Sequence, residues 1–127
     1  MPTLFERIVS GELPCHKVWE DEHHLAFLDI QPRVEGHTLV IPKVAEDYLF
    51  DLDEASHAAL WSAAREVATK LKAEFGCERV CVWVVGYEVP HAHIHLLPTS
   101  GLEQAPLPPV DGAAQARLAQ TAARLAP

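Results

Sequence analysis

The chain has 127 residues, nearly half of them hydrophobic, and its formal net charge is −8 at pH 7. The length suits one domain with a single core, and the hydrophobic content excludes an intrinsically disordered chain. The acidic balance argues against binding a nucleic-acid polymer, because such surfaces need many Lys and Arg side chains. The negative net charge does not exclude binding of a small phosphorylated ligand.

The sequence shows no feature of export or membrane insertion. Its first residues lack the basic and then apolar run of a signal peptide, and no apolar stretch reaches the roughly 20 residues that span a bilayer. The three cysteines, Cys15, Cys77 and Cys81, form no C-x-x-C pair, so we expect reduced thiols. These features predict a soluble, cytoplasmic protein with no membrane partner.

One short helix and three strands are predicted in the first part of the chain. Apolar residues at helical spacing favour a helix over Leu4–Val9, which ends at Gly11–Pro14. Strands are predicted at His16–Glu20 and His23–Leu28, joined by a tight turn, and at His37–Ile41.

One long helix and two further strands follow. Asp51 fits the N-cap of a capping-box start, and Gly76 suits the helix end. One apolar stripe runs along this helix, formed by Leu60, Ala64, Val67, Leu71 and Phe75. The run Val80–Val85 is apolar at every position, so we expect a strand buried on both faces, with a neighbouring strand at His91–Leu97.

The C-terminal part differs in composition from the rest. Gly101–Gly112 contains three prolines and predicts an extended arm, and the Ala-rich segment Ala113–Ala126 predicts a helix. Together the elements predict an α+β fold with a five-stranded, mostly antiparallel sheet, one long helix and a short N-terminal helix. Residues 1–104 are expected to form the domain, and residues 105–127 the Pro-rich arm and C-terminal helix.

Three histidines alternate with apolar residues at His91–His95. In a strand, His91, His93 and His95 would share one face. A metal could bridge two neighbours, about 6.7 Å apart at Cα, but one straight strand offers no third ligand. Exposed histidines without a role are a second alternative. Nucleophilic attack on phosphorus is the third, and the middle residue, His93, has an imidazole on each side for this task.

This segment resembles the His-x-His-x-His signature of the histidine triad (HIT) family of nucleotide hydrolases and transferases. A second block is similar to the other signature of that family: Leu25-Ala26-Phe27-Leu28-Asp29-Ile30-x-Pro32, leading to Gly36–Lys43. Phe5, Ile8 and Pro14 fall where the Hint branch of the family has its N-terminal helix and following turn. The likeness extends roughly from residue 3 to residue 98 and implies a HIT-like fold.

The resemblance implies a role for each matching polar residue. In the family the middle histidine attacks the α-phosphorus and carries the nucleotidyl group, which implies His93 as nucleophile. His95 and His37 are implied to contact phosphate oxygens, and His91 to orient the nucleophile through its backbone carbonyl. Asp29 is implied to bind the ribose hydroxyls.

Four apolar residues are implied to sandwich the base: Phe5, Ile8, Phe27 and Ile30. They also suit the edge of the core, and both descriptions can hold. His37 could instead cap a turn, and Asp29 could cap the following loop through an Asx-turn.

The segment before the triad departs from the family pattern. Tyr87 and Glu88 stand where many relatives have Gln and a hydroxyl residue. A carboxylate beside a phosphate is repulsive unless it is protonated or turned away. Glu88, which we count among the nucleotide-binding candidates, could also orient a histidine or move a proton to the leaving group. Thr3 and Glu6 occupy the places where some bacterial relatives have a zinc-binding Cys-x-x-Cys, so no metal is expected.

The resemblance implies a nucleotide-binding hydrolase that acts on purine nucleoside monophosphate derivatives, above all phosphoramidates such as AMP-amines. Cleavage at the α-phosphorus would pass through a nucleotidyl-histidine intermediate, without a cofactor. Hydrolysis of dinucleoside polyphosphates, regulatory nucleotide binding with little turnover, and metal binding remain alternatives. The implied partners are a purine nucleotide (an AMP or GMP derivative) and a second copy of the chain, since Hint members are typically homodimers joined edge to edge. We expect Val80–Val85 to form that edge.

Overall fold

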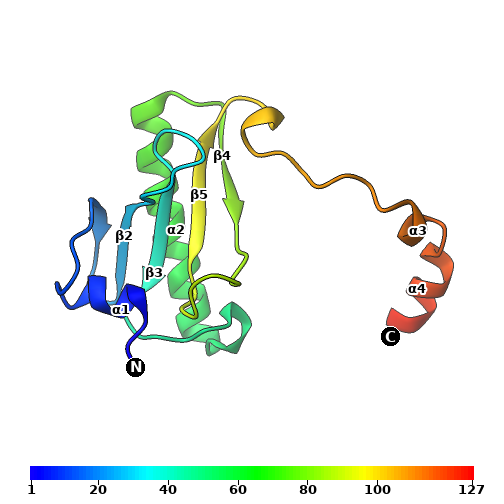
Figure 1. Cartoon of the computed structure of the whole chain (residues 1–127), viewed down its shortest axis with the longest axis horizontal. Helices are drawn as coiled ribbons and strands as arrows, with labels where there is room; N and C mark the ends of the chain where they lie inside the picture. Colours follow the sequence, from blue (N-terminus) through cyan, green and yellow to red (C-terminus); the bar gives the residue numbers. More distant parts are fainter.

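One five-stranded antiparallel sheet forms the centre of the molecule, for which the computed structural model describes all residues from 1 to 127 (Figure 1). Its strands are β1 (Lys17–Glu20), β2 (His24–Leu28), β3 (Thr38–Pro42), β4 (Arg79–Trp83) and β5 (Ile94–Thr99). They lie in the order β1-β2-β3-β5-β4, and each neighbouring pair is antiparallel. The predicted α+β class with an antiparallel sheet is confirmed.

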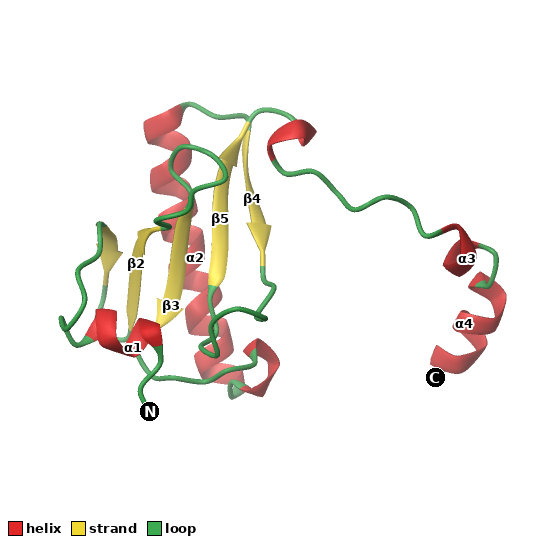
Figure 2. Ribbon diagram, in the orientation of Figure 1, coloured by secondary structure: helices red, strands yellow, loops and turns green.

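Helices cover both faces of the sheet (Figure 2). The long helix α2 (Glu54–Phe75) lies along one face, and the short helix α1 (Leu4–Val9) lies against the other. Because successive strand residues point to opposite faces, the central strands supply apolar side chains to both sides. Toward α2, the buried strand residues are Ala26, Val40, Ile94 and Leu96. On the α1 side, the buried cluster is Phe5, Leu25, Phe27, Leu39 and Ile41.

The helix α2 begins two residues later than the sequence predicts. Its N-cap is Asp53, whose carboxylate accepts a hydrogen bond from the Ser56 amide at 2.8 Å. Asp51, the predicted cap, is instead the last residue of a short 3₁₀ helix, η1 (Leu49–Asp51). The C-terminal end is as predicted, at Gly76 in the left-handed conformation.

The strand β4 is an edge strand and is not buried on both faces within this chain, contrary to the prediction for Val80–Val85. It pairs only with β5, and it ends at Trp83. Val82 is 45 % exposed and Val85 is 55 % exposed. Val80 packs, partly buried, against the core cluster under α2, whereas the valines that follow it remain exposed.

The strand β5 begins at Ile94, so the predicted strand at His91–Leu97 starts three residues too early. Before Ile94 the backbone turns away from the ladder: the Ala92 amide donates to the Glu46 carbonyl and the His91 amide to the Val89 carbonyl. Ala92 is nevertheless buried like Ile94, as the alternation predicts. Only His95 of the three triad histidines is therefore a strand residue.

The C-terminal segment runs away from the sheet as an extended arm (Figure 1). After a short 3₁₀ helix, η2 (Leu102–Gln104), every residue from 106 onward is exposed. The single helix predicted for Ala113–Ala126 is divided into α3 (Gly112–Gln115) and α4 (Leu118–Leu125), because Arg117 has a non-helical conformation. None of the helices combines the length and the apolar character that a membrane crossing requires.

Candidate active site

A cavity of about 780 Å³ lies beside β5 on the face opposite α2. Its walls come from the β2–β3 loop, the β4–β5 loop and the first residues of the arm. Five of the candidate catalytic and nucleotide-binding residues line it together: Asp29, His37, Glu88, His93 and His95. Residues separated by more than 60 positions are thus brought to one place by the β3–β5 pairing.

His93 is held with one ring nitrogen engaged. Its Nδ1 lies 2.6 Å from the backbone carbonyl oxygen of His91. A carbonyl can only accept, so Nδ1 carries the proton, and in the neutral ring Nε2 carries the free lone pair. The edge of the Phe5 ring approaches His93, with the two ring centroids 5.0 Å apart. His93 therefore presents the ring form that a nucleophile requires.

His91 is fully buried and does not line the cavity. Its Nε2 lies 2.8 Å from the carbonyl oxygen of Pro42, so Nε2 donates. Its Nδ1 lies 2.8 Å from the hydroxyl oxygen of Thr3. Burial lowers the pKa of His91, which keeps the ring neutral. The ring is thus fixed at both nitrogens, and its residue's carbonyl holds His93.

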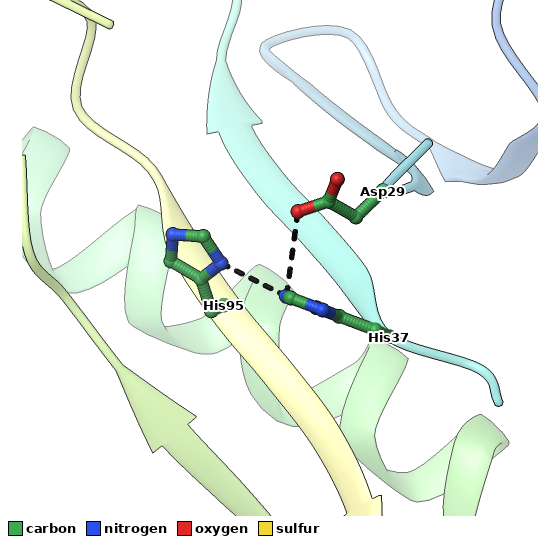
Figure 3. A group of neighbouring side chains, drawn as sticks. All are labelled: Asp29, His37 and His95. Carbon is green, nitrogen blue, oxygen red and sulfur yellow. Dashed lines mark hydrogen bonds and ion pairs between the residues drawn. The ribbon is translucent and has the colours of Figure 1, made fainter. Parts of the chain in front are cut away.

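His37 and His95 form a hydrogen-bonded pair across β3 and β5 (Figure 3). The Arg33 amide donates to Nδ1 of His37 at 3.1 Å, so the proton of neutral His37 is on Nε2. That Nε2 lies 2.9 Å from Nδ1 of His95 and donates to it. By the same logic, neutral His95 carries its proton on Nε2, where it can donate to a ligand.

Burial keeps both rings of this pair uncharged. It lowers the pKa of His37, against the opposing effect of Asp29. It lowers the pKa of His95 to about 4, with the neighbouring rings of His93 and His37 acting in the same direction. Near neutral pH both rings of this pair are therefore neutral.

Asp29 lies at the rim of the pair. Its Oδ1 accepts from the Gln31 amide at 2.8 Å, which is the Asx-turn arrangement considered from the sequence. Its Oδ2 is 3.6 Å from Nε2 of His37 (Figure 3). One carboxylate oxygen is thus committed to the loop, and the other is close to the histidine pair.

Asp29, His37 and His95 together have the composition of a metal site, with one ligand atom of each within 4.8 Å of the others. The hydrogen bonds oppose this use. A histidine that binds a metal through Nε2 carries its proton on Nδ1 and donates it to a neighbour, whereas Nδ1 of His37 receives the Arg33 amide proton. The donor set therefore fits a hydrogen-bonded pair better than a metal centre.

Of the four residues expected around the base, three pack together and Ile30 lies apart from them. Phe5 and Phe27 are buried, with ring centroids 5.6 Å apart, and Ile8 packs partly buried against their cluster. Ile30 is 86 % exposed. None of the four lines the cavity that contains the histidines. Their role in base binding stays a prediction.

Three residues of the site were not singled out for it from the sequence. Thr3 contacts His91, the Arg33 amide fixes His37, and Trp83 lies 6.4 Å from both His37 and His95 between ring centroids. Trp83 pairs with His95 across β4 and β5, so the correct strand register would have placed it. No sequence pattern indicated the contacts of Thr3 or of the Arg33 backbone.

The sequence model of the HIT domain family matches residues 10–102, which is more than half of the chain. The chain belongs to the HIT domain family. An uncharacterized 13.2 kDa HIT-like protein of Azospirillum brasilense is 44 % identical over 100 residues, covering 73 % of this chain and 82 % of the relative. The adenosine 5'-monophosphoramidase HNT1 of Saccharomyces cerevisiae is 33 % identical over 96 residues, covering 75 % of this chain and 61 % of the yeast protein.

Solved structures show the same HIT fold. A HIT family member from Bacillus subtilis superposes with a TM-score of 0.79 at 28 % identity, covering 100 % of this chain and 99 % of that chain. That alignment includes the C-terminal arm.

Proposed function

We propose that this HIT protein is a nucleotide hydrolase that cleaves purine nucleoside phosphoramidates at the α-phosphorus through a nucleotidyl-histidine intermediate. The observation that carries the proposal is the 2.6 Å hydrogen bond from Nδ1 of His93 to the His91 carbonyl, which leaves Nε2 free on a ring that lines the cavity. The name of the yeast relative, an adenosine 5'-monophosphoramidase, supports the same substrate class.

The first step forms a bond between His93 Nε2 and phosphorus while the bond from phosphorus to the amine nitrogen breaks and that nitrogen takes up a proton from solvent. The Nε2–H of His95 is available to a phosphoryl oxygen, because Nδ1 of the same ring accepts from His37. Such a donor stabilises the charge that develops in the transition state and is typically worth about 3–4 kcal/mol. In the second step, water attacks the phosphorus and releases a proton to solvent, the bond to Nε2 breaks, and the nucleoside monophosphate leaves.

The charges around the cavity favour an amine over a polyphosphate as leaving group. Four carboxylate side chains line it, and one cationic side chain, Arg33, does. The carboxylates are Asp29, Glu35, Glu88 and Glu103. A departing polyphosphate would place several negative charges among them, whereas an alkylamine gains a proton and a positive charge as it leaves. The acidic lining thus supports phosphoramidates over dinucleoside polyphosphates.

A turnover assay with two histidine variants tests the proposal. Wild-type protein is expected to release AMP from an adenosine phosphoramidate, and His93→Ala is expected to lose this activity. His23→Ala is the matched control, because the His23 side chain is 76 % exposed and contacts none of the triad. Quenching in alkaline denaturant, in which the acid-labile bond between phosphorus and nitrogen survives, should trap a nucleotidyl adduct on wild type and His23→Ala and not on His93→Ala. Equal turnover by wild type and His93→Ala would reject the mechanism, and nucleotide binding without turnover would favour a regulatory protein.

We further propose that two copies of the chain pair along β4. One side of this edge strand has no hydrogen-bonded neighbour strand. Beside it lies an apolar hollow of about 610 Å³, whose lining includes Val82, Val84, Tyr48, Phe50 and Trp61. An exposed apolar edge strand is a ready surface for pairing with another chain. A two-fold axis beside β4 would join the two sheets into one and cover these side chains.

A further inference from the structure

The N-cap of α1 is in contact with the triad. The Thr3 hydroxyl oxygen accepts from the Glu6 amide at 3.0 Å, and the Glu6 carboxylate accepts from the Thr3 amide at 2.9 Å. These two bonds form a capping box and hold the Thr3 side chain in one orientation. The hydroxyl proton takes no part in the capping box, and Nδ1 of His91 lies 2.8 Å away.

The chemistry of His91 decides the direction of this contact. Nε2 of His91 must donate to the Pro42 carbonyl, so Nδ1 of the neutral ring has only a lone pair to offer. The Thr3 hydroxyl is therefore the donor. Its bond holds the His91 ring with its proton on Nε2, and it does so where the ring is fully buried.

We propose that Thr3 is a positioning residue for the nucleophile. Thr3 and Pro42 hold the His91 ring from its two sides, and the amides of His91 and Ala92 hold the adjoining backbone. The His91 carbonyl between these anchors is the group that receives Nδ1–H of His93. The chain of contacts thus runs from the start of α1 through His91 to the free Nε2 of His93. This role in catalysis rests on the proposed function of His93.

Capping and donation can be separated by substitution, because they use different properties of the side chain. Ser keeps both the acceptor oxygen for the Glu6 amide and the hydroxyl proton for His91. Ionised Asp is a good N-cap, but its oxygens can only accept. Val has the shape of Thr and offers neither interaction. A residue that acts only as a cap should therefore be replaced equally well by Ser and by Asp.

The test compares Thr3→Ser, Thr3→Asp and Thr3→Val with wild type in two measurements. The first is kcat and KM for an adenosine phosphoramidate, alongside Tm. We expect Thr3→Ser to retain wild-type kcat, and Thr3→Asp and Thr3→Val to lose roughly two- to tenfold in kcat with KM little changed, the range of one neutral hydrogen bond. Only Thr3→Val should also lower Tm through loss of the cap. Wild-type kcat in Thr3→Asp would overturn the proposal.

The second measurement is the ¹⁵N NMR signature of the His91 ring, which needs no substrate. Wild type and Thr3→Ser should show an unprotonated Nδ1 and a protonated Nε2, and Thr3→Asp should show a proton on Nδ1, attracted by the carboxylate. An unchanged His91 signature in Thr3→Asp would overturn the proposed contact. If wild type turns over no phosphoramidate, the proposed function fails, and the NMR result still decides whether Thr3 sets the state of His91.

Discussion

Each of the four site histidines has a hydrogen-bond partner that determines which of its ring nitrogens carries the proton. The carbonyls of Pro42 and His91 can only accept, and they fix the rings of His91 and His93 respectively. The Arg33 amide can only donate, and it fixes His37, which in turn fixes His95. A second proton on His37 or His95 would break one of these bonds, because Nδ1 of each of these rings accepts a hydrogen bond. Nε2 of His93 takes part in none of them.

Acidification is expected to destabilise the folded protein before most carboxylates titrate. The pKa of His95 is lowered to about 4 by burial, and the pKa values of His37 and His91 are lowered too, against an ordinary value of 6.5. Between pH 6.5 and about 4 the unfolded chain binds more protons than the folded one, so stability falls as the pH falls through this window. Tm measured from pH 7.5 to 4.5 should decrease, and less steeply in His95→Gln. A flat Tm over this range would contradict the neutral rings.

Glu88 is expected to select the leaving group by its charge. Glu88→Gln should lower kcat/KM for phosphoramidates of cationic amines by roughly two- to fivefold, the size of an exposed charge interaction, and should raise it for a dinucleoside polyphosphate. Glu66→Gln, on an exposed part of α2 outside this cavity, is the control. Equal effects on both substrate classes would assign Glu88 a role other than charge selection.

The elements were largely predictable, and their ends were not. The alternation of polar and apolar residues gave the correct faces for Ile94–Leu96, but His91 is buried and does not line the cavity. The same alternation continues before Ile94, where the backbone leaves the ladder, so it did not reveal where the strand begins. From the sequence, either Asp51 or Asp53 could cap the long helix. Asp51 belongs to η1 in the structure, so Asp53 is the cap of α2. The triad and Asp29 were found by spacing and resemblance. Contacts made through backbone groups or distant side chains, such as Arg33 and Thr3, have no sequence signature.

Gly36 positions the start of β3 and is expected to tolerate no side chain. Its φ is +87°, and a Cβ atom there would lie 2.5 Å from Cε2 of Phe75. Gly36→Ala should cost about 1–2 kcal/mol from the backbone conformation, and more from the contact with the Phe75 ring. Because His37 follows directly, kcat should fall as well.

Gly11 provides the matched control for this substitution, with a φ of +84° and open space around its Cβ position. Urea unfolding of Gly36→Ala and Gly11→Ala should show the greater loss in Gly36→Ala, and the difference measures the contact with Phe75. Equal losses would show that the Phe75 ring moves aside without cost.

At the scale of the whole molecule, the site depends on segments that only the complete fold brings together. Thr3 is the N-cap of α1, His37 comes from the β2–β3 loop, and the triad comes from the end of the β4–β5 loop and the start of β5. The β4–β5 loop, with Glu88, lines one side of the cavity and leads back to the exposed edge strand. Pairing along β4 would therefore also order a wall of the site.

Dimerisation is expected to depend on the apolar side chains of this edge. Val82→Asp should place a charge in the proposed interface and shift the mass in solution from twice the chain mass of 14.0 kDa to the chain mass itself. Val44→Asp is the control, because Val44 is 78 % exposed and lies outside β4 and the apolar hollow. Light scattering after size exclusion measures both. If the β4–β5 loop is ordered by the partner, monomeric Val82→Asp should also turn over phosphoramidates more slowly, whereas a wild type that is monomeric at micromolar concentration would exclude the interface.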